Sequence, residues 1–334
     1  MSNFLLSSSE LKSSISGIKS QEDFNITALQ VFYFQYQNNP IYKEWVDTLK
    51  TDIKQIKNYS QIPFLPISTF KTHQVKSFLG DAQKVFSSSG TSGMQSSNHH
   101  VFDMALYQES YRKAFEYYYG SVKDYTILAL LPSYLEREGS SLIWMVEDLI
   151  SLSESPKSGF YLYNYAELLE TILQLQKESK KVILLGVSFA LLEFAEHFSF
   201  HFPELIVMET GGMKGRRKEL LRDELHQILT QAFGVQNIHS EYGMSEMLSQ
   251  AYSSGKGIFQ APPWMKILIR DTNDPLSLLP TSKAGGINVI DLYNLYSCSF
   301  IATQDLGKVN SDGSFEILGR FDHSDIRGCN LLVL

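Results

Sequence analysis

The stretch KVILLGVSFALLEFAEHFSF, residues 181–200, constrains the fold more than any other part of the sequence. After Lys181 it continues as an apolar run to Val187, without the polar alternation of a strand that faces water on one side. Strands of this kind are buried on both faces, as in parallel sheets covered by helices. Residues 189–200 then predict a helix. The segment therefore predicts one strand–helix unit of an α/β fold.

The same alternation of strand and helix extends to both sides of this segment. Further strands are predicted at residues 125–131, 205–208 and 237–240, and helices at 141–152, 166–179 and 217–233. This order predicts a mainly parallel sheet flanked by helices. After Pro262 the pattern changes to shorter β runs at 265–270, 287–292, 299–302 and 315–318. These runs predict a β-rich subdomain packed on the α/β core.

The amino-terminal part is predicted to be helical after a Ser-rich start. Residues 1–24 form a Ser-rich segment, and we expect its first twenty residues to be poorly ordered or loosely packed. Pro40 divides the helical pattern of residues 25–59 into two helices, and residues 101–119 predict another. The chain is thus divided into a segment 1–24 and one domain, 25–334. Within that domain, 25–261 is the α/β core and 262–334 the β-rich subdomain with a C-terminal cysteine segment.

The composition excludes several classes of protein. With 334 residues, 43% of them apolar and 13% aromatic, the chain has ample material for a core and is not disordered. A net charge of −7 argues against a dedicated nucleic-acid binder. The two cysteines, Cys298 and Cys329, exclude a disulfide scaffold and a cysteine-rich zinc domain. No targeting signal or bilayer-spanning apolar run is apparent, so we expect a cytoplasmic protein without stable membrane insertion.

A loop rich in glycine and hydroxyl groups is the most informative short segment. Residues 87–93 read SSSGTSG. Glycines let backbone N–H groups approach a ligand closely, and the hydroxyls add further donors, which suits the phosphate oxygens of a nucleotide. The loop is not a Walker A motif, because it lacks the Gly-Lys-Ser/Thr sequence. Taken alone, it is equally compatible with a flexible surface loop.

Four further motifs follow this loop along the chain. They are ETGGMKG at 209–215, EYGMSE at 241–246, TQDLG at 303–307 and LGRFD at 318–322. The first places a glycine turn at the carboxyl end of a strand, which is the ligand-binding edge of an open α/β sheet. The second combines an aromatic ring, a glycine for close approach, a hydroxyl and a carboxylate. Each motif alone is compatible with ordinary turn chemistry, but their order favours a nucleotide site.

That order, SSGTSG, GG, YGMSE, TQDLG and GRFD, resembles the adenylate-forming superfamily of acyl-CoA synthetases, peptide-synthetase adenylation domains and luciferases. The stretches ETGGMKGRR, SEYGMSEMLSQAY, PPWMKILIRD and DIRGCNLLV are most similar to acyl-protein synthetases of the LuxE type, with phenylacetate–CoA ligases as neighbours. The resemblance runs from about residue 25 to the end of the sequence. It implies the large-domain fold of adenylate-forming enzymes, lacking the mobile C-terminal domain of the ligases.

The resemblance also implies a reaction and a set of ligands. A carboxylate would attack the α-phosphate of ATP, releasing pyrophosphate and leaving an acyl-adenylate, while Mg²⁺ and fixed donors stabilise the developing charge. The implied ligands are Ser88, Ser89, Gly90, Thr91, Ser92 and Gly93 for the phosphates, Gly211 and Gly212 for the adenine side, Tyr242 with Gly243 for the base, Ser245 for the α-phosphate, Glu246 for magnesium, and Asp305 with Arg320 for the ribose.

Cys329 is the implied acyl acceptor. In LuxE-type proteins the acyl group passes to a cysteine near the carboxyl end and then to an acyl-CoA reductase-type partner, which yields an aldehyde. Cys329 in the sequence RGCN matches that position, and Arg327 could lower the pKa of its thiol. The alternative for any single cysteine is a small buried apolar residue, which is what we expect of Cys298. The implied substrate is a carboxylic acid, and we expect a long-chain fatty acid.

Two features depart from the superfamily pattern. Many members carry a lysine where this sequence has Ser96, and the ligases carry a catalytic lysine in the mobile domain beyond the GRxD motif. Ligation to CoA by the usual domain rotation is therefore not expected here. A protein acceptor such as Cys329 does not need that domain.

Two other interpretations stay open. The sequence GVSFA at 186–190 resembles a nucleophile elbow at a strand–helix turn, which would make the chain a serine hydrolase or acyltransferase. Its candidate residues are Ser188 with His226 or His239 and with Asp291 or Asp305. The chain could instead be a non-catalytic subunit that binds a nucleotide or an acyl group. ATP–pyrophosphate exchange driven by a carboxylic acid discriminates between these interpretations.

Overall fold

The fold is built on a group of parallel strands. The structure is a computed structural model that describes residues 6–88, 96–131, 139–162, 164–211 and 220–321. Its parallel strands are β4 (Tyr125–Leu130), β5 (Gly159–Phe160), β6 (Lys181–Val187), β7 (Ile206–Thr210) and β8 (Ile238–Tyr242). They lie in the order β5-β4-β6-β7-β8. Every residue of β4 and all of β6 after Lys181 are buried, as an unbroken apolar run requires.

Antiparallel strands extend this sheet beyond β8. They are β9 (Ala251–Ser253), β10 (Ile258–Gln260), β11 (Met265–Arg270), β12 (Ala284–Asp291), β13 (Phe300–Val309) and β14 (Phe315–Arg320). Their order from β8 outward is β9-β10-β14-β13-β12-β11, and β1 (Leu65–Pro66) pairs in parallel with β13. The β-rich region after Pro262 is confirmed. It continues the core sheet, because β14 pairs with β10, which precedes Pro262 in the chain.

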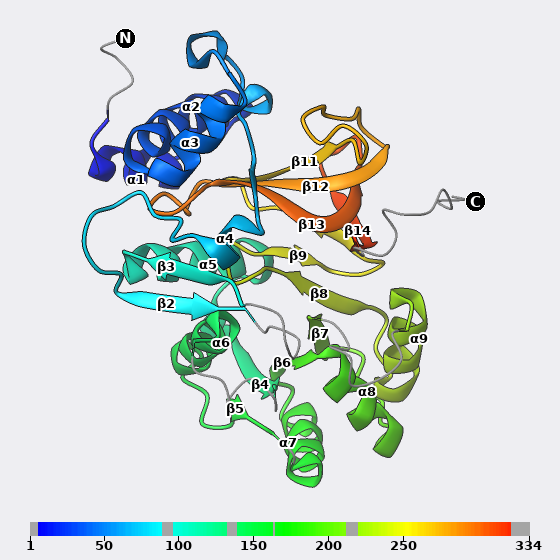
Figure 1. Cartoon of the computed structure of the whole chain (residues 1–334). Helices are drawn as coiled ribbons and strands as arrows, with labels where there is room; N and C mark the ends of the chain where they lie inside the picture. The colour runs from blue at the N-terminus through cyan, green and yellow to red at the C-terminus, as the bar shows by residue number, and fades with distance from the viewer. Residues whose placement is uncertain (1–5, 89–95, 132–138, 163, 212–219, 322–334) are drawn as a thin grey trace.

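Helices surround the parallel strands (Figure 1). They are α6 (Ser141–Leu152), α7 (Tyr165–Lys177), α8 (Ser188–His197) and α9 (Arg222–Phe233), and they follow the strands in the alternating order that the sequence predicts. α7 shows why they pack in this way: its Leu168, Ile172 and Leu175 lie on one stripe and are buried, whereas its other face is polar. A further helix, α5 (Met104–Tyr119), and a separate two-stranded sheet of β2 (Lys84–Ser87) and β3 (Asn98–Val101) complete this part.

The amino-terminal helices pack beside strands β11 to β13 (Figure 1). They are α1 (Ser8–Ser16), α2 (Gln21–Asn38) and α3 (Pro40–Thr48), followed by the short α4 (Thr69–Thr72). Single 3-10 turns lie at Ile53–Gln55, Tyr59–Gln61 and Val122–Asp124. The break predicted at Pro40 is confirmed. The loose packing predicted for the Ser-rich start is wrong for the residues described there, because α1 buries Leu11 and Ile15.

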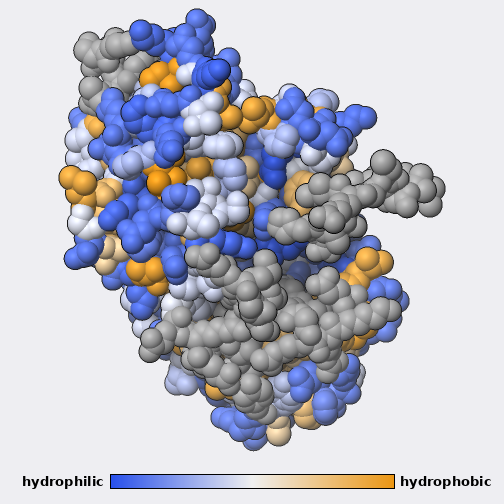
Figure 2. Space-filling view, viewed as in Figure 1, coloured by the Kyte–Doolittle hydropathy of each residue, from blue (hydrophilic) through white to orange (hydrophobic). Residues whose placement is uncertain are grey.

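The apolar side chains gather in a core that extends along the sheet. On the face shown in Figure 2, the apolar residues of the described chain form small separate groups among hydrophilic ones. Among the described helices, none combines the length and the apolar character needed to cross a membrane.

Candidate active site

The carboxyl ends of β6, β7 and β8 meet at one edge of the sheet. Val187 pairs with Thr210, and Thr210 pairs with Glu241, so the three strands end at nearly the same level. The residues that follow these ends are Ser188, Gly211 and Gly243. The carboxyl edge of a parallel sheet is where α/β proteins bind their ligands. The structure thus places Gly211 of the ETGG motif and Gly243 of the YGMSE motif on the same edge.

Tyr242, Asp305 and Arg320 form a polar cluster beside this edge. The Tyr242 hydroxyl donates to Asp305 Oδ2 at 2.8 Å, and Arg320 Nε donates to Asp305 Oδ1 at 3.1 Å. Asp305 is buried, whereas 74% of the Arg320 side chain is exposed. Burial and the Asp305 charge raise the pKa of Tyr242 well above its usual value, so the phenol stays a donor. Three residues with implied nucleotide roles are therefore brought together.

Glu246 is a buried carboxylate linked to the glycine-and-hydroxyl loop. The Ser97 hydroxyl donates to Glu246 Oε1. Ser97 and Ser88 also bind each other, through Ser88 N to Ser97 O at 3.1 Å and Ser97 N to Ser88 Oγ at 3.0 Å. Burial raises the pKa of Glu246, and the Ser97 hydrogen bond with the charges of Arg320 and Lys71 offsets part of this increase. Ser88 and Glu246 therefore lie on either side of Ser97.

The Ser245–Glu246 backbone is held by two side chains that the sequence did not single out as a pair. His99 Nδ1 lies 2.8 Å from the carbonyl oxygen of Ser245, and His99 Nε2 lies 3.0 Å from Asn294 Oδ1. Asn294 Nδ2 donates to the carbonyl oxygen of Glu246 at 2.8 Å. Burial lowers the pKa of His99 to about 4, so the ring is neutral near pH 7. Nothing near His99 in the sequence points to Asn294, which lies 195 positions away.

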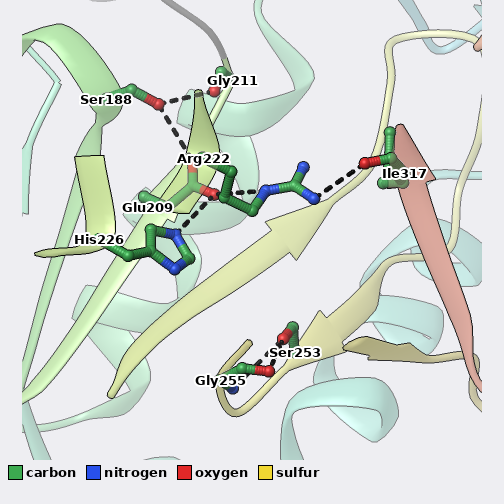
Figure 3. A network of polar contacts seen from close by, with 8 residues as sticks. All are labelled: Ser188, Glu209, Gly211, Arg222, His226, Ser253, Gly255 and Ile317. Carbon is green, nitrogen blue, oxygen red and sulfur yellow. Dashed lines mark hydrogen bonds and ion pairs between the residues drawn. The ribbon is translucent and has the colours of Figure 1, made fainter. Parts of the chain in front are cut away.

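A second polar network lies at the ends of β7 and α9 (Figure 3). Glu209 accepts a hydrogen bond from Ser188 Oγ at 3.0 Å, and the same hydroxyl lies 2.9 Å from the Gly211 carbonyl oxygen. Glu209 Oε1 is 3.6 Å from His226 Nε2 and 3.9 Å from Arg222 Nε. Ser188 therefore fixes the turn at Gly211, while Glu209 ties that turn to α9.

The serine-hydrolase interpretation is not supported by this geometry. Ser188 is buried, and its hydroxyl is committed to Glu209 and to the Gly211 carbonyl rather than to a histidine. Of the nominated histidines, His226 contacts Glu209, and His239 Nδ1 lies 3.1 Å from the Tyr119 hydroxyl. A nucleophilic serine needs a histidine within hydrogen-bond reach to take its proton.

Nor do the nominated acids complete such a triad. Asp291 accepts hydrogen bonds from Leu248 N and from both the backbone and the side chain of Ser249. Asp305 belongs to the Tyr242 cluster. Both carboxylates are therefore already bound elsewhere, away from Ser188.

Glu241, directly before Tyr242 at the end of β8, has no role among those that the resemblance implies. It accepts a hydrogen bond from Thr210 Oγ1 at 2.5 Å through Oε2. Its Oε1 lies over Gly243: a Cβ atom at that position would be 2.6 Å from Glu241 Oε1. Burial and the neighbouring Glu209 raise the pKa of Glu241 to about 7. One feature of the sequence could have drawn attention to Glu241: it is a glutamate directly before a Tyr-Gly pair at the end of a predicted strand.

Several predicted site residues lie outside the described residues. These are Ser89, Gly90, Thr91, Ser92, Gly93, Gly212 and Cys329. The other cysteine, Cys298, is fully buried, its Sγ lies 3.4 Å from the Phe300 carbonyl oxygen, and burial raises the pKa of its thiol to about 12. The expectation that Cys298 is a core residue is confirmed.

No protein-family model and no curated protein matches the sequence. Among solved structures, the 2-hydroxyisobutyryl-CoA ligase in the postadenylation state, in complex with 2-HIB-AMP, matches with a TM-score of 0.67 and 14% identity, covering 90% of this chain and 68% of that one. Its open conformation, with 2-HIB-AMP and CoA, matches at 0.64 and 12% identity, covering 92% and 72%. This chain has the fold of the adenylate-forming enzymes.

A third match is less complete. ATP-bound MatB from Rhodopseudomonas palustris has a TM-score of 0.52 and 18% identity, over 71% of this chain and 47% of MatB. The chain thus spans about half the length of MatB. The adenylate-forming fold predicted from the ordered motifs is confirmed. Tyr242 is the last residue of β8, and Glu246 follows it four positions later.

Proposed function

We propose that this chain is an ATP-dependent acyl-protein synthetase of the LuxE type. The observation that carries the proposal is a pair of neighbouring groups in an adenylate-forming fold: the Tyr242–Asp305–Arg320 cluster, and the buried Glu246 linked to Ser88 through Ser97. Arg320 connects the two groups, because its charge offsets part of the increase that burial causes in the pKa of Glu246. In the proposed reaction a carboxylate oxygen bonds to the α-phosphorus of ATP and the bond to pyrophosphate breaks. The product is an acyl-adenylate.

The described residues suit ATP and magnesium. Mg²⁺ is usually held by one or two carboxylates together with phosphate oxygens, and Glu246 supplies one buried carboxylate beside the Ser88–Ser97 pair. When bound, the ion would neutralise the charge that gathers on the α-phosphate. Arg320 and Asp305 would take the ribose hydroxyls, with Tyr242 and Gly211 on the adenine side. The Arg320 side chain is 74% exposed, so its guanidinium is accessible to a ligand while its Nε holds Asp305.

The second half of the proposed reaction uses Cys329, which lies outside the described residues. Its thiolate attacks the carbonyl carbon of the acyl-adenylate, a thioester bond forms, and AMP leaves with the electron pair of the broken C–O bond. We expect a long-chain fatty acid as the substrate and an acyl-CoA reductase-type protein as the partner that takes the acyl group. A cytoplasmic location, where thiols stay reduced, would keep Cys329 available.

Two measurements on the purified chain test this function. The first is ATP–pyrophosphate exchange with Mg²⁺ and a panel of carboxylic acids, which detects adenylate formation alone. The second is intact mass after incubation, where a thioester adds the mass of the acid less one water. We expect exchange with at least one acid, and a hydroxylamine-labile adduct in wild type that is absent from Cys329→Ser.

Cys298→Ala is the matched control, because it removes the other thiol, which is buried in the core. It should keep the adduct. Exchange with no acid would refute the adenylation step. An adduct that persists in Cys329→Ser, or that lies on Ser188, would refute the assignment of the acceptor while leaving adenylation intact.

A further inference from the structure

Arg222, the first residue of α9, contacts two strands that the candidate site uses. Its Nε lies 3.9 Å from Glu209 Oε1 on β7. Its Nη1 donates to the Ile317 carbonyl oxygen of β14 at 3.0 Å. Figure 3 shows the guanidinium between these two groups, which belong to strands that are not neighbours in the sheet. One side chain thus joins the parallel strands to β14.

The start of β10 leaves room for Arg222 to reach β14. Gly257 has a φ of +63°, and a Cβ atom there would lie 3.1 Å from both Cδ and Nη1 of Arg222, so any larger residue would crowd this side chain. The guanidinium lies over the Phe259 ring of β10, 5.4 Å from its centroid. The described pairing of β10 with β14 ends at Glu316. Arg222 donates to the carbonyl of the next residue along β14 and so extends that pairing by one hydrogen bond.

At its other end Arg222 meets a buried carboxylate that holds a glycine turn. Glu209 is 6% exposed, and its Oε2 accepts a hydrogen bond from Ser188 Oγ, which also lies 2.9 Å from the Gly211 carbonyl oxygen. Burial opposes ionisation of Glu209, but the His226 ring and the Arg222 charge outweigh burial and lower the pKa of this carboxyl. Arg222, Glu209, Ser188 and Gly211 therefore form one continuous series of contacts.

The β14 contact lies close to a residue of the candidate nucleotide site. Arg320 follows Ile317 by three positions on β14, pairs with Asp305 of β13, and donates from Nε to Asp305 Oδ1 at 3.1 Å. A strand advances about 3.3 Å per residue, so Arg222 binds β14 about 10 Å from Arg320 along one extended segment. In the proposed function Arg320 contacts the ribose and Gly211 the adenine side. Two nucleotide contacts from separate parts of the sheet are therefore joined through Arg222.

We propose that Arg222 is a positioning residue that sets the spacing between Gly211 and Arg320 and thereby the fit of the ribose. The inference rests on the proposed function and adds to it a residue outside the motifs. A guanidinium suits this task, because its planar fork offers separate donors to Glu209 and to the Ile317 carbonyl. Loss of Arg222 should therefore weaken recognition of the ribose and leave binding of the carboxylic acid unchanged.

The test measures how well the protein distinguishes ATP from 2′-deoxy-ATP in pyrophosphate exchange. Wild type should favour ATP by at least about 10-fold in KM, because the deoxy nucleotide leaves charged partners of the hydroxyl unpaired. Arg222→Met should reduce this preference to within about 3-fold of unity, while the KM for the acid stays within about 2-fold of the wild-type value. Arg222→Lys keeps a cation beside Glu209 and should show an intermediate preference; it serves as the second variant if the methionine change prevents folding.

A double-mutant cycle with Arg320 separates positioning from a general loosening of the fold. Arg320→Met should also remove the preference for ATP, and adding Arg222→Met to it should change the KM for ATP by less than about 2-fold, because both act through the same ribose contact. Lys308→Met is the matched control: it removes the cation that binds Glu316 of β14 at 3.0 Å, and it should keep the preference. Additive effects of the Arg222 and Arg320 changes, or a preference that survives in Arg222→Met, would overturn the inference.

A chain without exchange activity would refute the proposed function and still leave the positioning role testable. Amide hydrogen exchange without nucleotide, followed by mass spectrometry, is then the readout. Arg222→Met should speed exchange both at residues 206–211 and at residues 315–320, whereas Lys308→Met should leave 206–211 unchanged. A wild-type exchange rate in either segment of Arg222→Met would show that Arg222 does not hold the two strands together.

Discussion

Glu209 and Glu241 stand on neighbouring strands, and their environments shift their pKa values in opposite directions. Burial alone would raise the pKa of Glu209, but the His226 ring and the Arg222 guanidinium outweigh burial and lower it (Figure 3). Glu241 has no cation among its described contacts, so burial and the charge of Glu209 raise its pKa to about 7. The two glutamates therefore differ in protonation: Glu209 stays ionised, whereas Glu241 can be protonated near neutral pH.

The shifted pKa of Glu241 makes the stability of the fold depend on pH. Between about pH 4.5 and pH 7 the unfolded chain ionises Glu241 while the folded chain keeps it protonated, so stability falls as pH rises through this window. Glu241→Gln has no ionisable group at this position, so its stability does not fall in this window. The difference in free energy of unfolding between the variant and wild type should therefore grow in favour of the variant as pH rises. We expect this change to be absent below pH 4.5 and to reach about 3 kcal/mol above pH 7.

Urea unfolding of both proteins at pH 4.5 and pH 8 measures this difference. The groups that face Glu241 are Glu209 on β7, Tyr107 and Tyr119 on α5, Tyr252 on β9, and His239 on β8. They are the same in both proteins, and Glu116→Gln controls for the loss of a carboxylate elsewhere. A difference that does not change with pH would contradict the assignment of the titration to Glu241.

At the scale of elements, the junction of α2 and α3 depends on Asn39. Its side chain accepts a hydrogen bond from Tyr42 N at 3.0 Å, which caps α3, and donates to the Ser297 carbonyl oxygen at 3.0 Å. Asn39→Ala removes the cap, worth about 1 kcal/mol, and leaves a buried carbonyl with one partner fewer. We expect a loss of about 2–3 kcal/mol in the free energy of unfolding.

Chemical denaturation of Asn39→Ala and Asn38→Ala measures this loss. Asn38 is exposed, and its hydrogen bond among the described residues stays within its own helix, from Nδ2 to the Phe34 carbonyl oxygen at 2.8 Å. The control should therefore lose less than about 1 kcal/mol. Equal losses in the two variants would show that helix propensity, rather than the contact with Ser297, accounts for the effect.

The elements that the sequence predicted are those whose burial leaves a periodic or unbroken apolar pattern. β4 and β6 are unbroken runs, and α7 has a clear stripe, so each was recognised. β9 and β10 have three residues each, which is too short for any period to appear. α1 was missed because serine dominates it, although its capping box of Ser7 and Glu10 was readable.

The residues of the candidate site also fall into those that a local sequence pattern reveals and those that it does not. Tyr242, Glu246, Asp305 and Arg320 stand in short motifs, and the motifs could be ordered along the chain. Their partners could not be predicted, because Ser97 meets Glu246 and His99 meets Asn294 only when segments far apart in sequence come together. Such pairs carry no local pattern.

At the scale of the whole molecule, one large sheet runs through both the α/β core and the β-rich region. Its parallel and antiparallel strands form a continuous order from β5 to β11 in the described chain. The amino-terminal helices are bound to the connection between β12 and β13 by buried polar contacts: Gln35 Nε2 donates to the Asn294 and Leu295 carbonyl oxygens, and Ser299 N donates to Gln35 Oε1. Domain boundaries fall where few contacts cross, and these contacts leave no such place between α2 and the sheet.

This continuity predicts that the chain unfolds as one cooperative unit, although its length would allow two. Its three tryptophans report on separate regions: Trp45 lies in α3, Trp144 in α6, and Trp264 directly before β11. Three variants that each keep one tryptophan, with the other two changed to phenylalanine, should show fluorescence transitions that coincide with the loss of circular dichroism in the same protein. If the Trp45 signal changed at a lower denaturant concentration than the circular dichroism of that variant, the amino-terminal helices would be a separate unit, and the contacts of Gln35 and Asn39 would not couple them to the sheet.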